Sequence, residues 1–252
     1  MTMWAESTEG MHNLFRLSSL SSLEGYYFKP RMDKEILQTY SKGLIVSTGC
    51  PSGAIQTRLR LGQYDEAVRE AAELQDIFGR DNVFLELMDH GIDIEKRVRD
   101  DLLKLGKQLG IPPIATNDSH YNNPEDADAH DALICVASGK RLSDTNRLKF
   151  DGGGYYIKSA AEMRELWADR FGMPEACDNT VAIAEKCHVE LPKEFYMPNF
   201  PIPEESKSET LDDYRALNEP ATRHASSGRA ATSWSRGSWR STRSRRCRST
   251  SG

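Results

Sequence analysis

Short apolar runs alternate with longer amphipathic segments between residues 43 and 138, and this alternation constrains the fold most. Residues 43–48, 83–87 and 114–117 are short and apolar and lie next to turn-forming residues, as buried strands do. Strands separated by helices of this length pair in parallel through right-handed crossovers. The sequence therefore predicts an α/β fold in which these three strands are adjacent and parallel.

The segments between the runs carry the 3.6-residue period of helices that pack on a sheet. Residues 63–78 form the first of these helices, which ends at Gly79. In the second, Asp93 is the expected N-cap and Gly110 the stop. Its expected buried stripe is Ile94, Val98, Leu102, Leu105 and Leu109. Three strands do not close a barrel, so we expect an incomplete barrel with an open edge, an exposed inner face and a tendency to aggregate.

Three more helices are predicted in the second half, at residues 124–138, 160–171 and 174–186. A segment punctuated by proline follows them and indicates a domain boundary. The predicted organisation is a partial barrel at 1–150, C-terminal helices at 151–190, a linker at 191–214 and a tail at 215–252.

The tail differs from the rest of the chain in composition. Residues 221–252 contain eight Arg but no Lys, Asp or Glu, although the whole chain has a net charge of −5. The segment from about Arg215 onward shows neither helical nor strand period, so we expect it to be disordered. One interpretation is a nucleic-acid-binding arm. The other is a frameshifted reading of a GC-rich gene, which would explain Arg without Lys.

The remaining composition is that of a cytoplasmic protein with reduced thiols. The sequence shows no apolar run long enough to cross a bilayer and no secretory signal at Met1. The five Cys are widely spaced and form no CxxC pair, so neither disulfides nor a zinc ribbon is predicted.

The strongest candidate site combines Asp118, His120 and Cys50. Asp118 and His120 follow a predicted strand and are two residues apart, so in an extended backbone their side chains project to the same side. Cys50 follows another strand. Barrels build their sites at this end of their strands, and carboxylate, imidazole and thiolate together suit zinc, with manganese or iron as alternatives. The alternative is that Asp118 caps a turn, His120 is exposed and Cys50 is buried as a small apolar residue.

Other residues of similar chemistry are better explained by structure. His90 and His130, which is next to Asp131, are expected to be structural. Glu86 on a central strand is either a ligand or half of a salt bridge. The glycines at 152–154 lack the spacing of a phosphate-binding loop.

Six blocks of the sequence carry a resemblance to a known family. They are LFRLSSLSS at 14–22, GYYFKPR at 25–31, STGCPSG at 47–53, FLELMDHG at 84–91, IPPIATNDSHY at 111–121 and GYYIK at 154–158. In this order they resemble the rear part of the PHP domain of the bacterial DNA polymerase III alpha subunit, a C-family replicative polymerase. The likeness covers residues 1–214 and is greatest to the high-GC Gram-positive, or actinobacterial, form.

The resemblance implies a distorted β/α barrel that holds a metal cluster beside a polymerase core. In that family the domain removes mismatched 3′ nucleotides in some bacteria and docks a separate exonuclease in others. Cys50, Asp118 and His120 match family ligands of zinc or manganese. The other ligands, including an H-x-H motif, would precede Met1, and the polymerase palm with its magnesium would follow Tyr214. We therefore expect a truncated chain that binds metal weakly and is inactive alone.

The implied parent function is DNA-directed DNA synthesis with a PHP-linked 3′–5′ exonuclease. Its expected partners are DNA, the sliding clamp and an exonuclease subunit. No association with a membrane is expected. A free-standing PHP phosphoesterase is the first alternative, although it requires an H-x-H motif, which the sequence lacks. A non-catalytic nucleic-acid-binding fragment is the second, and a steep salt dependence of DNA affinity would favour it.

Overall fold

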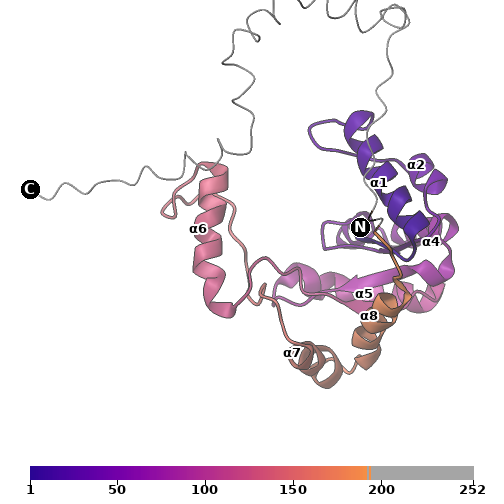
Figure 1. The fold of residues 1–252 in the computed structure, drawn as a ribbon. Coiled ribbons are helices and arrows are strands. Elements are labelled where there is room, and N and C mark those ends of the chain that lie inside the picture. Colours follow the sequence, from indigo (N-terminus) through magenta and orange to yellow (C-terminus); the bar gives the residue numbers. More distant parts are fainter. Residues whose placement is uncertain (192, 194–252) are drawn as a thin grey trace, which may run out of the picture. The chain divides into compact units, whose positions relative to one another are not determined.

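A four-stranded sheet organises residues 1–191 and 193, which are the residues that the computed structural model describes (Figure 1). Parallel pairing joins β2 to β3 and β3 to β4, which confirms the three predicted adjacent strands. A further strand, β1, pairs antiparallel with β2 and was not predicted. The strands are β1 (Met3–Ala5), β2 (Leu44–Ser47), β3 (Val83–Leu87) and β4 (Pro113–Ala115).

The five predicted helices are present, whereas three further helices before residue 61 were not predicted. The range 160–171 divides into a short α-helix and a π-helical segment, and the range 124–138 begins with a 3₁₀ turn. The α-helices are α1 (Thr8–Leu23), α2 (Lys34–Thr39), α3 (Ala54–Arg60), α4 (Tyr64–Phe78), α5 (Asp93–Leu109), α6 (Ala127–Ser138), α7 (Ala160–Arg164) and α8 (Pro174–Lys186). The shorter turns are η1 (Arg80–Asn82), η2 (Pro124–Asp126) and the π-helical η3 (Glu165–Arg170).

Helix α5 differs from the prediction at its start and on its buried face. Asp93 is the first helical residue, and the N-cap position belongs to Ile92, which has no side-chain oxygen to accept a hydrogen bond. The apolar stripe is buried in its middle but only half-buried at Ile94 and Leu109. Glu95 is buried as well, although the apolar pattern marks it as a surface residue.

The two faces of the sheet pack into different apolar clusters, as the alternation of a strand requires. On one face, Leu44, Val83 and Leu85 join the main core, which also holds buried residues of α4 and α5. On the other, Ile45, Phe84 and Ile114 pack with Ile183 of α8. The expectation of an exposed inner face is therefore wrong, because α8 supplies apolar contacts to residues that are at most 6% exposed.

The predicted boundaries in the last part of the chain lie mostly outside the described residues. The linker at 191–214 is described only at Leu191 and Lys193, and the tail at 215–252 is not described. Among the described helices, none is long and apolar enough to cross a membrane.

Candidate functional site

The three predicted ligands follow the same end of the parallel strands. Cys50 comes after β2 and is a half-buried free thiol, whereas Asp118 and His120 come after β4 and are exposed. His120 and Asp118 are joined directly, because Nδ1 of the His120 ring lies 2.6 Å from the Asp118 carbonyl oxygen. Within residues 1–191 and 193, no three His, Cys, Asp or Glu side chains are placed to hold a metal ion. The ligand set therefore stays a prediction.

The backbone at Asp118 is strained. Its φ of +43° lies in the left-handed region, which Phe28 alone shares among the described residues other than glycine. A non-glycine residue holds such a conformation only where its surroundings impose it, and such residues cluster at functional sites. The strain therefore marks the turn at Asp118 as one that the fold constrains.

An aromatic cluster surrounds the ring of His120. The Phe150 ring lies edge-on at 4.6 Å and the His130 ring is 5.4 Å away. His130 also contacts Phe150 and Tyr121, in keeping with its predicted structural role. This cluster limits the directions that the His120 ring can take.

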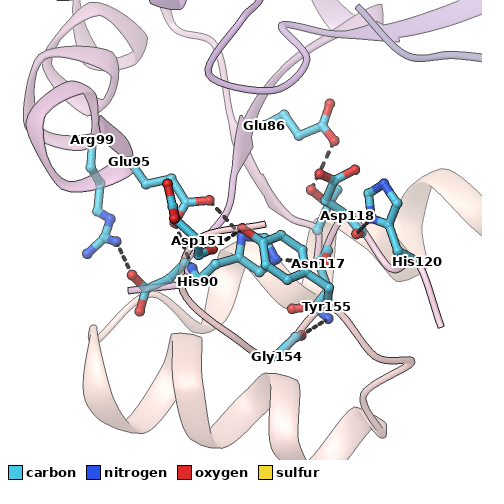
Figure 2. A network of polar contacts seen from close by, with 12 residues as sticks. Glu86, His90, Glu95, Arg99, Asn117, Asp118, His120, Asp151, Gly154 and Tyr155 are labelled. Atoms are coloured by element: carbon cyan, nitrogen blue, oxygen red, sulfur yellow. Dashed lines mark hydrogen bonds and ion pairs between the residues drawn. The ribbon is translucent and has the colours of Figure 1, made fainter. Parts of the chain in front are cut away.

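Asn117 connects this turn to a segment more than thirty residues later in the chain. Its side-chain amide donates to the carbonyl oxygens of Gly154 at 2.8 Å and Tyr156 at 2.7 Å, and its Oδ1 accepts from Lys158 Nζ at 2.6 Å. The Asn117 carbonyl oxygen lies 2.9 Å from His90 Nε2. Figure 2 shows Asn117 between His90 and the turn that carries Asp118 and His120.

His90 is part of a buried ion pair. Its Nδ1 lies 2.6 Å from Glu95 Oε1, and its backbone N–H donates to Glu95 Oε2 at 2.6 Å. The imidazole ring stacks on Tyr155 with a centroid distance of 3.9 Å and an interplanar angle of 6°. Burial, aided by the nearby carboxylates of Glu95 and Asp118, raises the pKa of Tyr155 to about 12. The structural role expected for His90 agrees with these contacts.

Stability should depend on pH through His90. Burial disfavours the charged imidazole, but the hydrogen bonds to Glu95 and the Asn117 carbonyl outweigh burial and the nearby Lys158 charge, so the pKa of His90 rises above 6.5. The folded state then binds the proton more tightly than the unfolded state does. The free energy that this tighter proton binding adds to stability is fully present below pH 6.5. It is lost as the pH rises through the raised pKa that His90 has in the folded state.

We therefore expect the free energy of unfolding to fall as the pH rises above 6.5. Urea unfolding at a series of pH values would measure this fall. The variant His90→Gln should show a smaller fall over the same range, whereas other titrating groups contribute equally to both proteins. Identical slopes for the two proteins would contradict the assignment.

Within the described residues, Glu86 does not form the salt bridge that was one of its two predicted roles. It is buried in β3, and its carboxylate accepts hydrogen bonds from the hydroxyls of Ser47, Thr2 at 3.2 Å and Thr116 at 2.9 Å. Within the described part of the chain, no cation pairs with it. Hydroxyl donors replace the predicted salt bridge, which suits a carboxylate buried between strands.

The sequence did not indicate that Asn117, Glu95 and Lys158 contribute contacts to this site. Asn117 and Lys158 lie in two of the family-like blocks, and that was the signal available. No local pattern shows that a helical Glu faces inward, or that residues 117 and 158 meet. The contact between Asn117 and Lys158 forms because residues 154–158 run alongside the turn at Asp118. There Tyr121 and Tyr156 form a β-bridge.

Comparison with known proteins finds one matching domain family and several similar proteins. The PHP domain family matches residues 1–90. The DNA polymerase III subunit alpha of Saccharopolyspora erythraea is 58% identical over 186 residues, which are 74% of this chain and 15% of the relative. The same subunit of Mycobacterium tuberculosis is 54% identical over 209 residues, 81% of this chain and 17% of the relative.

A more distant relative follows the same pattern. The DNA polymerase III subunit alpha of Borreliella burgdorferi is 41% identical over 217 residues, 85% of this chain and 18% of that protein. Identity is higher to the two actinobacterial proteins, which confirms the expected actinobacterial likeness. The chain spans less than a fifth of the length of these relatives. It is therefore a homologue of part of the bacterial DNA polymerase III subunit alpha, and its residues 1–90 match the PHP domain.

Proposed function

We propose that this chain corresponds to the rear part of the PHP domain of a replicative DNA polymerase. In the longer protein it would accompany DNA-directed DNA synthesis and contribute to metal-dependent hydrolysis of the DNA 3′ end. The observation that carries the proposal is the 54–58% identity to alpha subunits over most of the chain, which includes the turn at Asp118 and His120. The partners implied are DNA, the sliding clamp and an exonuclease subunit.

We propose Cys50, Asp118 and His120 as the ligands that this chain supplies. The Asp118 carboxylate and Nε2 of His120 make no hydrogen bond within the described residues, so both are free to act as ligands, and their chemistry suits zinc or manganese. A metal ion in the complete centre would stabilise charge on the phosphodiester and generate hydroxide near neutral pH. Magnesium would belong to the polymerase core of the longer protein.

We expect the 252-residue chain by itself to bind zinc weakly. A complete zinc site in a protein needs at least three protein ligands, and the described residues do not bring three together. Competition with a chromophoric chelator would measure the affinity. Asp178→Asn provides a control, because Asp178 lies on α8 and pairs with Arg164 at the surface. Stoichiometric binding at sub-micromolar zinc that Asp118→Asn abolishes would contradict the expectation.

A chimeric polymerase tests the function of the site in its longer context. Residues 1–190 of this chain would replace the matching segment of the Mycobacterium tuberculosis relative. Primer extension reports whether the chimera folds, and metal-dependent removal of a mismatched 3′ nucleotide reports on the site. We expect Asp118→Asn to abolish removal and leave extension intact. The proposal fails if Asp118→Asn leaves removal unchanged, or if a chimera that extends primers removes no mismatch. Removal by the isolated chain would favour a free-standing phosphoesterase instead.

A further inference from the structure

We propose that Asn117 is a positioning residue, which holds the turn at Asp118 so that His120 presents Nε2, and not Nδ1, as its free nitrogen. The part of this inference that concerns metal binding rests on the proposed function. The positioning itself rests on hydrogen bonds between groups far apart in the sequence.

Every hydrogen-bonding group of the Asn117 side chain is occupied. Its two N–H groups donate to Gly154 and Tyr156, and its oxygen accepts from Lys158. A side-chain amide has two donors and one acceptor oxygen, so these contacts define the orientation of the amide without ambiguity. Lys158 Nζ also donates to the Gly154 carbonyl oxygen, which ties the two ends of residues 154–158 together.

The backbone of Asn117 is held from the opposite side. Its carbonyl oxygen can only accept, so Nε2 of His90 must donate to it. The other ring nitrogen of His90 pairs with Glu95, and the ring stacks on Tyr155. Asn117 is therefore fixed by a buried ion pair through its main chain and by residues 154–158 through its side chain.

The strained residue Asp118 lies between two anchored neighbours. Asn117 anchors the turn before it, and after it the Ser119 hydroxyl donates to the Tyr156 carbonyl oxygen at 3.0 Å. The His120 N–H donates to the Tyr155 carbonyl oxygen at 2.7 Å. These contacts supply the constraint that a left-handed φ at a non-glycine residue requires.

This conformation determines the tautomer of His120. The Asp118 carbonyl oxygen lies 2.6 Å from Nδ1, and because a carbonyl only accepts, Nδ1 carries the proton. In the neutral ring the lone pair then belongs to Nε2. A hydrogen bond from one ring nitrogen to a backbone carbonyl is the usual way in which proteins orient a histidine ligand.

The experiment measures this tautomer in the 252-residue chain by long-range proton–nitrogen NMR of the histidine rings, at a pH where His120 is neutral. We expect the chain to show protonated Nδ1 at His120, and Asn117→Ala to shift His120 toward protonated Nε2. Asn179→Ala is the matched control, because Asn179 also donates an amide hydrogen bond to a backbone carbonyl, that of Pro113 in β4, but makes none to the turn. The control should keep the original tautomer.

Lys158→Met is the second variant if Asn117→Ala does not fold. It removes one of the three contacts of the Asn117 amide, so we expect a partial shift in the same direction. Protonated Nε2 in the unaltered chain would overturn the inference. An unchanged tautomer in both Asn117→Ala and Lys158→Met would overturn it as well.

Zinc added to the same samples separates this inference from the proposed function. We expect zinc to perturb Nε2 of His120 in the unaltered chain, with an affinity about 10-fold lower in Asn117→Ala, as for the loss of an outer-shell contact. If the tautomer is as expected but zinc leaves His120 unperturbed, the positioning stands and the metal role fails. If zinc perturbs His120 in a chain with protonated Nδ1 and binds equally well to Asn117→Ala, the metal role stands and the positioning has no effect on it.

Discussion

Replacing Trp167 by alanine is expected to lower the free energy of unfolding by about 4 kcal/mol, the cost of emptying a large aromatic site in a core. Trp167 lies in η3, is fully buried, and packs against Phe171 at 5.2 Å between ring centroids. The guanidinium of Arg99 lies over the Phe171 ring at 4.2 Å and over Trp167 at 5.8 Å. Loss of the indole would therefore also remove one wall of the Arg99 site.

Trp167→Phe removes the indole N–H but keeps an aromatic ring in the site. Within the described residues, Nε1 of Trp167 is buried without a hydrogen-bond partner, so removing it carries no hydrogen-bond cost. We expect this variant to lose less than Trp167→Ala, because the phenyl ring fills part of the space that alanine leaves empty. Urea unfolding followed by circular dichroism would measure both variants. Equal losses for Phe and Ala would contradict the assignment of the loss to the emptied volume.

Replacing Glu95 by alanine is expected to cost about 3 kcal/mol, because removing one member of a buried pair leaves the other charge without compensation. Two donors lose their acceptor, the backbone N–H of His90 and its Nδ1–H. Glu95→Gln keeps one acceptor oxygen and should lose less. Urea unfolding at pH 6 is the measurement, since the pKa of His90 is raised and its ring is charged there.

Asp178→Ala provides the comparison for this prediction. The Asp178 side chain pairs with Arg164 at 2.6 Å, but the two side chains are 60% and 49% exposed. Exposed pairs contribute little, so the expected change is below about 1 kcal/mol. If Asp178→Ala costs as much as Glu95→Ala, burial is not what makes the His90–Glu95 pair important.

Local sequence patterns were sufficient for most elements of this fold. The runs that became β2, β3 and β4 and the helices α4 and α8 were predicted to within a few residues, because strand period, helix period and turn residues are properties of neighbouring positions. Parallel pairing followed from the length of the connections. The position of Asp118 and His120 beyond a strand end was predicted for the same reason.

Other features needed contacts between distant parts of the chain. Strand β1 was not predicted, and it is defined by its antiparallel pairing with β2. The inner face of the sheet was expected to be open, but α8, which comes about sixty residues after β4, packs against it. An amphipathic pattern shows that a helix has an apolar face, and it does not show which surface that face covers.

Patterns among neighbouring residues were enough to predict β2, β3, β4, five helices and the chemical types that follow the strand ends. No local pattern indicated that Glu95 faces inward to pair with His90, that Asn117 meets residues 154–158, or that His120 donates through Nδ1. A carboxylate on a helix is normally solvated, and it is buried only where a partner from elsewhere in the chain offsets the cost of desolvation. That partner comes into reach only when the chain has folded.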